Sequence, residues 1–147
     1  MQLEKIYVDT SAFYALLDRS DQYHEQAKDL WPSLLEDHVA LMTSNYVVSE
    51  TISLLQYRLG FKAALIWYKD ILGIVEIAWT DQNIHRKAFE LWINLGRHHL
   101  SLCDCASYII MNQHHIEKAF SFKKSFANQG FTLLPKNLSL SSLKVPN

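Results

Sequence analysis

Three acidic residues, Asp9, Glu50 and Asp104, each lie at or near the start of a predicted helix that follows a strand or an extended segment. The carboxyl ends of parallel strands meet at one edge of a sheet, so we expect the three carboxylates to gather there. Carboxylates held together repel one another unless a cation joins them. Oxygen ligands favour a hard ion that also binds phosphate and activates water. We therefore predict a Mg²⁺ or Mn²⁺ site.

Each acid also has a purely structural explanation. Asp9 directly follows the buried-type run Ile6-Tyr7-Val8, where it or Thr10 could simply cap the next helix. Ser101-x-x-Asp104 has the spacing of a capping box, and the helix dipole favours an acid in the first turn. Glu50 could be a partly solvated helix residue. The matching positions of all three favour a metal site over three separate structural roles.

The elements that must position these acids alternate between short apolar runs and helical segments of crossover length. This pattern predicts a mostly parallel sheet covered by helices on both faces. We expect strands at 6–8, 39–43, 73–78, 118–122 and 131–134, and helices at 11–17, 21–35, 45–59, 61–72, 81–97, 103–115 and 123–128. Ser20 and Thr80 are predicted helix caps, and Pro32 is expected to kink its helix or end it early.

At 147 residues, with 49% hydrophobic and 20% charged residues, the chain can form one domain, which we place at residues 1–135. Residues 136–147 are serine-rich and aperiodic, so we expect a loose tail. We see neither a membrane span nor a signal peptide, which indicates the cytoplasm. A net charge of −1 means that any attraction for a polyanion must be local or come from a bound cation.

Histidines and cysteines invite a zinc hypothesis, but their spacing fits none of the common structural zinc patterns. Cys103 and Cys105 flank Asp104 at a helix start, and we interpret them as small core residues in a reducing compartment. The histidines nearest in sequence are His98, His99, His114 and His115.

In four segments the chain resembles the PIN-domain ribonucleases, especially the VapC-like toxins of bacterial toxin–antitoxin pairs. Each segment alone is unspecific, but their order and spacing span roughly residues 6–134. The segments are Val8-Asp9-Thr10-Ser11, Thr43-Ser44-x5-Glu50, Leu100-Ser101-Leu102-x-Asp104, and Ala119-Phe120-Ser121-Phe122 followed by Phe126 and Gly130-Phe131.

The resemblance implies a three-layer α/β/α sandwich around a central, mostly parallel sheet of four or five strands. It implies that Asp9, Glu50 and Asp104 bind the metal, and that the hydroxyls of Thr10 and Ser101 orient these acids. It further implies an endoribonuclease that hydrolyses RNA phosphodiester bonds, forms a homodimer and is silenced by a small antitoxin protein.

One position departs from the family pattern. Where these proteins usually carry a fourth acid, directly after the Ala-Phe-Ser-Phe segment, this chain has Lys123. Lys123 could be an exposed lysine beside a three-acid site, or it could contact substrate phosphate as a point charge. Alternatively, its ammonium could pair with the acids and leave a weakened or inactive PIN-like binding module. Lys124 and Arg58 are further basic residues that could guide an RNA backbone, although a solvated surface role is the default for both.

Overall fold

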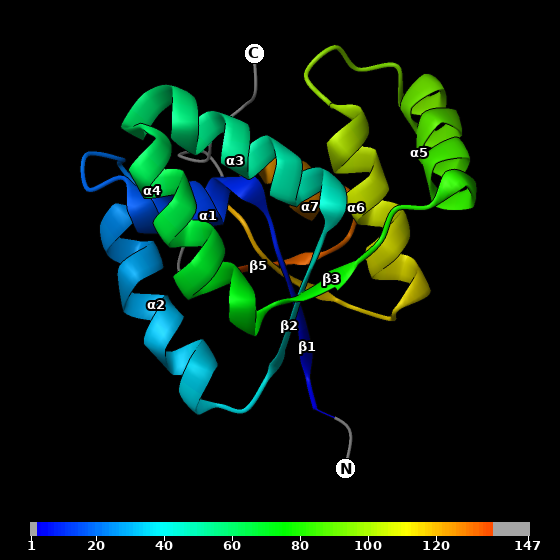
Figure 1. Ribbon diagram of the computed structural model, residues 1–147. Helices are drawn as coiled ribbons and strands as arrows, with labels where there is room; N and C mark the ends of the chain where they lie inside the picture. The colour runs from blue at the N-terminus through cyan, green and yellow to red at the C-terminus, as the bar shows by residue number, and fades with distance from the viewer. Residues whose placement is uncertain (1–2, 137–147) are drawn as a thin grey trace.

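The computed structural model describes residues 3–136, and its centre is a five-stranded sheet in which every neighbouring pair of strands is parallel (Figure 1). The strand order β3-β2-β1-β4-β5 places the first strand in the middle. The strands are β1 (Lys5–Val8), β2 (Ala40–Ser44), β3 (Glu76–Ala78), β4 (Lys118–Phe120) and β5 (Thr132–Leu134). The predicted alternation of strands and helices is confirmed, and the sheet is wholly rather than mostly parallel.

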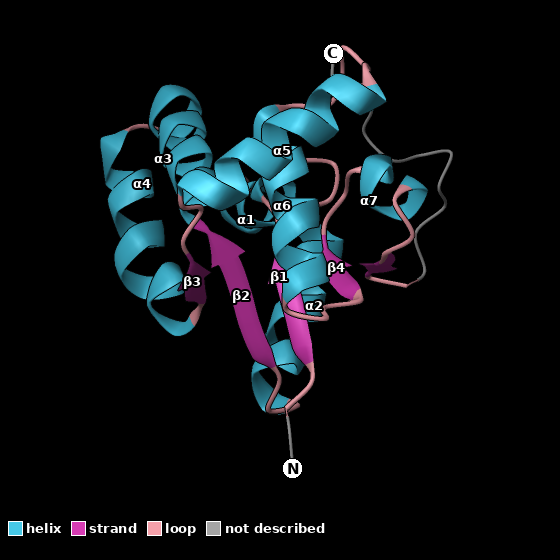
Figure 2. Ribbon diagram, turned by 90° about the vertical axis from the view of Figure 1, so that its right-hand side faces the viewer, coloured by secondary structure: helices cyan, strands magenta, loops and turns pink. Residues whose placement is uncertain are grey.

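Helices cover both faces of this sheet, which confirms the three-layer sandwich (Figures 1 and 2). The helices α1, α2 and α4 lie on one side and α5 and α6 on the other, while α3 spans the upper edge in Figure 1. Their bounds are α1 (Thr10–Leu17), α2 (His24–Glu36), α3 (Asn45–Leu59), α4 (Phe61–Ile66), α5 (Gln82–Leu95), α6 (Leu102–Gln113) and α7 (Lys124–Asn128). A π-helical turn, η1 (Trp67–Ile71), and a 3₁₀ turn, η2 (Leu72–Ile74), follow α4.

The central strand β1 is buried on both faces, as its unbroken apolar run predicts. Ile6, Tyr7 and Val8 are at most 2% exposed, and side chains from both helical layers complete the core around them. On one side, the ring of Phe13 meets Trp67 edge to face at 5.0 Å. Burying side chains of this size stabilises the fold by roughly 1.5–3 kcal/mol each, so β1 is a rigid base for the residue that follows it.

The edge of the sheet where the acids were expected lies at the carboxyl ends of β1 and β4. The chain leaves these two neighbouring strands in opposite directions. From β1 the chain proceeds to β2 and β3, whereas β4 and β5 lie on the other side of β1. Such a switch point opens a crevice beyond the carboxyl ends of the strands. Asp9 follows β1 there, and its backbone N–H donates to the carbonyl of Phe120 at 3.1 Å. Residues more than a hundred positions apart in the sequence are thereby held side by side.

Two predicted helix caps are wrong by one or a few residues. Ser20 does not cap α2, because its N–H and its hydroxyl both bind the carboxylate of Asp18, and the helix begins only at His24. Asp81 rather than Thr80 caps α5, because its Oδ1 accepts from the backbone N–H of Ile84 at 2.9 Å. At α5 an adjacent aspartate competes successfully with the hydroxyl residue that we expected to act, whereas α2 begins after Tyr23 without a side-chain cap.

Other boundaries also differ from the predictions. Pro32 lies inside α2 without ending it, since the helix continues to Glu36 and buries Ala27 and Leu34 on either side of the proline. The third strand comprises only Glu76–Ala78, because a 3₁₀ turn takes up residues 72–74. The fourth strand ends at Phe120 rather than at residue 122.

The proposed tail, residues 136–147, lies almost entirely outside the described residues. Within residues 3–136, no helix combines the length and the apolar character needed to cross a membrane.

Candidate active site

The two oxygens of the Asp9 carboxylate differ in their contacts. Its side chain caps α1, and Oδ2 accepts hydrogen bonds from the Ser11 hydroxyl at 2.8 Å, the Ser121 hydroxyl at 3.1 Å and the Ser11 N–H at 3.3 Å. Asp9 is only 1% exposed, yet Oδ1 has no hydrogen-bond partner within the described part of the chain. A buried carboxylate oxygen without a partner is costly unless a ligand completes it.

Asp104 opens α6 in the predicted capping box with Ser101. The Ser101 N–H donates to Asp104 Oδ2 at 3.2 Å, and the Asp104 N–H donates to the Ser101 hydroxyl at 3.0 Å. The second oxygen, Oδ1, accepts from the ammonium of Lys123 at 2.9 Å. Both oxygens of this carboxylate, which is 1% exposed, therefore already have partners.

Glu50 lies half-buried in the second turn of α3 and shares an electrostatic environment with the other two acids. Burial raises the pKa of its carboxyl, and the negative charges of Asp9 and Asp104 add to the rise. The ammonium of Lys123 and a hydrogen bond with Thr10 act in the opposite direction without cancelling it. The three predicted acids thus lie close enough to affect one another's charge.

Lys123 enters the site from the segment between β4 and α7. Its backbone N–H donates to the Ser121 hydroxyl at 3.1 Å, and its side chain is 15% exposed. Burial alone would lower the pKa of its ammonium. Attraction to Asp9, Asp104 and Glu50, with the hydrogen bond to Asp104, outweighs burial and raises that pKa well above its usual value. Lys123 is therefore a charged member of the acid cluster and not an exposed surface lysine.

Two hydroxyls that hold Asp9 were missed from the sequence. Ser11 stands two residues after Asp9, which is the spacing of an Asx turn and could have been recognised. Its hydroxyl also accepts from the Phe122 N–H at 2.9 Å, which fastens the segment after β4 to α1. Ser121 contacts Asp9 only because β4 lies beside β1, and no local sequence pattern reveals that pairing.

The hydroxyls of Thr10 and Ser101 bind different acids. Thr10 does not hold Asp9. Its hydroxyl accepts from Thr51 at 3.1 Å and is the hydrogen-bond partner of Glu50. Ser101 binds Asp104 as expected.

The remaining predicted residues lie away from the acids or in the core. Lys124 is exposed, and the Arg58 guanidinium stacks over the ring of Tyr14 at 5.4 Å. Cys105 is fully buried in a small cluster with Ala88 and Ala106, and burial raises the pKa of its thiol to about 11. It is a core residue, as predicted.

A hard divalent ion would find an incomplete set of ligands in this arrangement. Within residues 3–136 there is no group of three or more Asp, Glu, His or Cys side chains arranged to hold a metal. Asp9 and Glu50 offer carboxylate oxygens, and the partnerless Oδ1 of Asp9 fits such an ion. Asp104 Oδ1 already accepts from the ammonium of Lys123, so an ion bound there would share this oxygen with a positive charge.

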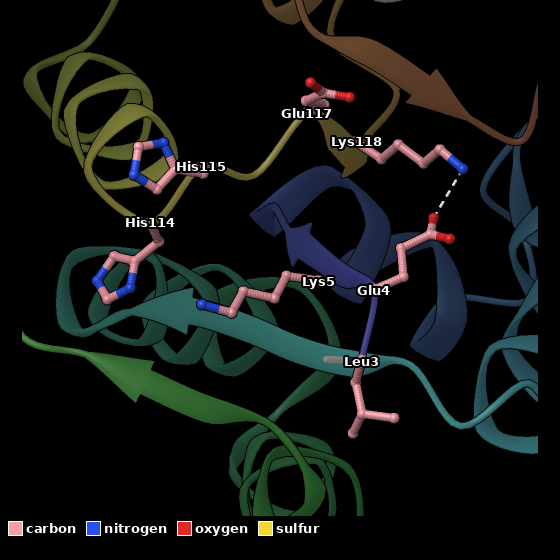
Figure 3. Close-up of a pocket in the computed structure, with 7 residues that line it drawn as sticks. All are labelled: Leu3, Glu4, Lys5, His114, His115, Glu117 and Lys118. Atoms are coloured by element: carbon pink, nitrogen blue, oxygen red, sulfur yellow. Dashed lines mark ion pairs between the residues drawn. The ribbon is translucent and has the colours of Figure 1, made fainter. Parts of the chain in front are cut away.

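A hollow of about 410 Å³ lies at the opposite, amino-terminal edge of the sheet (Figure 3). Both acidic and basic side chains line it, and Glu4 pairs with Lys118 at 2.7 Å. His114 and Lys5 point to one side, away from this ion pair. None of the three acids lines this hollow, so the acids at the switch point remain the candidate active site.

Comparison with known proteins agrees with this fold. The chain is 32% identical over 127 residues to the 23S rRNA-specific endonuclease VapC20 of Mycobacterium tuberculosis, covering 86% of this chain and 95% of that protein. The crystal structure of that Sarcin-Ricin loop cleaving toxin superposes with a TM-score of 0.78 at 31% identity and the same coverage.

More distant structures share the fold alone. FitAcB from Neisseria gonorrhoeae matches with a TM-score of 0.64 at 18% identity, covering 94% of this chain and 99% of that one. VapBC2 from Rickettsia felis, bound to a DNA fragment from its promoter, matches at 0.67 with 10% identity, covering 88% and 96%. The family model of the PIN domain matches residues 6–131. The chain therefore belongs to the PIN domain family.

Proposed function

We propose that this chain is a metal-dependent endoribonuclease and the toxin of a cytoplasmic toxin–antitoxin pair. The observation that carries the proposal is the gathering of Asp9, Glu50 and Asp104 at one sheet edge, where one buried carboxylate oxygen has no partner among residues 3–136. The relative that matches over most of both chains is named as an rRNA endonuclease, which supports RNA as the substrate.

In this proposal the three acids bind the metal, and neighbouring hydroxyl residues orient the acids. Asp9, Glu50 and Asp104 would hold Mg²⁺ or Mn²⁺, which when bound supplies an activated water and a counter-charge for the scissile phosphate. Ser11 and Ser121 fix Oδ2 of Asp9, and Oδ1 stays available for the ion. Thr10 orients Glu50, and Ser101 orients Asp104.

Partners follow from the same comparison. Solved structures with this fold include VapBC and FitAB assemblies, which supports a small antitoxin as a partner of this chain. Large exposed side chains on α3 and α4, including Tyr57 and Phe61, support a protein contact and a homodimer. Light scattering of the purified chain would test the dimer, and co-purification with the product of a small adjacent gene would test the antitoxin.

Cleavage assays on RNA test the enzyme directly, with the 23S rRNA sarcin–ricin loop as the first substrate. We expect wild type to cut only when Mg²⁺ or Mn²⁺ is present, and Asp9→Asn to lose about a hundredfold or more in rate. Asparagine is also a good helix cap, so this variant should keep its fold by circular dichroism. Undiminished cleavage in EDTA, or by Asp9→Asn, would contradict the proposal.

A second candidate function is favoured by one contact, the ion pair between Lys123 and Asp104. If that pair prevents metal loading altogether, the chain is a PIN-like binding module without activity. The Lys123→Asp variant distinguishes the two. Cleavage by wild type supports the enzyme, whereas cleavage that appears only in Lys123→Asp supports the module.

A further inference from the structure

Lys123 is the one described cation that forms an ion pair with the acids at this edge. Its Nζ lies 2.9 Å from Asp104 Oδ1, and both side chains are largely withdrawn from solvent. The ammonium also attracts Asp9 and Glu50. Without it, three largely buried carboxylates would lie close together with no cation between them. The lysine therefore neutralises part of their repulsion when no metal is bound.

The surrounding contacts fix Lys123 in this position. Ser121 donates to Asp9 through its hydroxyl and accepts from the Lys123 N–H, so one serine joins the carboxylate to the lysine backbone. The Lys123 carbonyl in turn accepts from Phe126 N–H in α7. These contacts fix the backbone from which the lysine side chain reaches Asp104.

The same contact withholds a ligand from any divalent ion. Asp104 Oδ1 is bound to the ammonium and Oδ2 to the Ser101 N–H. Asp9 Oδ1, in contrast, has no partner inside the described region, which marks the place where a cation would enter. An ion held there would be repelled by the ammonium of Lys123 and would lack free access to Asp104.

We propose that Lys123 is an internal counter-ion that competes with the divalent metal for Asp104. The contact stabilises the metal-free protein and weakens metal binding, so the two effects have opposite signs. This inference rests on the proposed function, because it takes the three acids as the metal ligands. It goes further by assigning the departure at position 123 a defined role in controlling metal loading.

The decisive variant is Lys123→Met, which keeps the apolar stem and removes the charge. Without divalent ions we expect its Tm to fall by about 10 °C, because a buried acid loses its partner. In Mn²⁺ titrations by calorimetry we expect binding roughly ten- to a hundredfold tighter than in wild type. Lys123→Arg, which keeps the charge, should retain the weak binding. The exposed neighbour variant Lys124→Met should change neither quantity.

Each result bears on a different part of the proposal. Unchanged or weaker Mn²⁺ binding by Lys123→Met, with wild type still binding Mn²⁺, would overturn the competition and leave the proposed function intact. An unchanged Tm in EDTA would overturn the counter-ion role. If neither wild type nor any variant binds Mn²⁺, both the competition and the metal-dependent function fail. Should Lys123→Met not fold, Lys123→Gln removes the charge while keeping a hydrogen-bond donor, and the same Mn²⁺ comparison decides.

Discussion

Asp9 shows how one side chain can serve the fold and a reaction together. Capping a helix and binding a metal compete only if they need the same oxygen, and here Oδ2 binds three donors while Oδ1 has no protein partner among the described residues. The cap holds the carboxylate in place without using the atom that a cation would need. The structural and functional explanations of Asp9 are therefore compatible, and the first supports the second.

When no metal is bound, the ionised carboxylate of Glu50 lowers the free energy of unfolding. Burial raises the pKa of its carboxyl above the ordinary value of 4.5, so the folded chain holds this proton more tightly than the unfolded chain. The free energy of unfolding must then decrease as the pH rises through the interval between the two pKa values. Above that interval, the full cost of the ionised carboxylate remains.

Replacing Glu50 by glutamine should therefore stabilise the metal-free protein. In EDTA at pH 7 we expect Glu50→Gln to raise Tm by about 1–3 °C, since a half-buried charge is partly screened by solvent. The difference should vanish well below pH 4.5, where wild-type Glu50 is protonated in both states. Thermal melts followed by circular dichroism across this pH range measure both effects.

A matched control for this experiment is Glu90→Gln, at an exposed position in α5. It should leave the Tm nearly unchanged at either pH. A fall in Tm for Glu50→Gln at pH 7 would mean that the attraction of Lys123 for Glu50 outweighs its burial.

The residues of the site were predictable to the extent that local patterns encode them. Asp104 and Ser101 follow from capping-box spacing, and the structure shows that box. The contact between Asp9 and Ser121, 112 positions apart, depends on the pairing of β1 with β4, which the sequence did not reveal. The position of Lys123 inside the acid cluster depends on the same pairing, so only the structure excludes an exposed surface lysine there.

At the scale of elements, helix starts determine where the acids lie. Asp9 is the cap of α1, Asp104 lies in the first turn of α6, and Glu50 lies in the second turn of α3, which Ser44 caps. Each helix begins at the carboxyl edge of the sheet, where its positive end faces the carboxylates. The cap of α5 was mispredicted because Thr80 and Asp81 can both cap a helix and the local geometry selects the aspartate, whereas α2 begins without a side-chain cap.

Pro32 is expected to destabilise helix α2. The proline is exposed and lacks the N–H that would bind the carbonyl four residues earlier, yet the helix continues past it. Packing of Ala27 and Leu34 against the core holds the two halves together. We expect Pro32→Ala to raise the free energy of unfolding by about 1 kcal/mol, a net of the restored hydrogen bond and a more flexible unfolded chain. Urea denaturation measures this difference.

Gln26→Ala is the control for Pro32→Ala, because Gln26 is exposed on the same helix and has an N–H. Its effect should stay within about 0.5 kcal/mol. If Pro32→Ala proves destabilising, the proline ring contributes packing that exceeds the cost of the missing bond.

At the scale of the molecule, the order of the strands assembles the site. Alternating strands and helices predicted a parallel sheet, but the pattern is equally compatible with several strand orders. The observed order places β4 directly beside β1, so the segment with Ser121 and Lys123 reaches Asp9. Asp104 comes to the same edge on α6, on the opposite face from α1.

The overall charge of the molecule leads to a prediction about RNA binding. The chain has a net charge of −1, and three acids surround its candidate active site. One lysine cannot neutralise the charge of three carboxylates, so the metal-free acid cluster should repel a phosphate backbone. A bound divalent ion would reverse this sign locally. We therefore expect RNA to bind at least about tenfold more tightly in Ca²⁺ than in EDTA at matched ionic strength.

Fluorescence anisotropy with a labelled sarcin–ricin loop RNA measures this effect, and gels of the same samples show whether the RNA stays intact. Lys124→Gln should weaken binding by a similar small factor with and without Ca²⁺, because its exposed charge acts independently of the metal. Asp9→Asn should remove most of the Ca²⁺ dependence, because it takes away a carboxylate that the ion needs. Equal affinity in Ca²⁺ and EDTA for the wild-type chain would show that RNA is held by surface lysines, and that the acid cluster does not govern substrate binding.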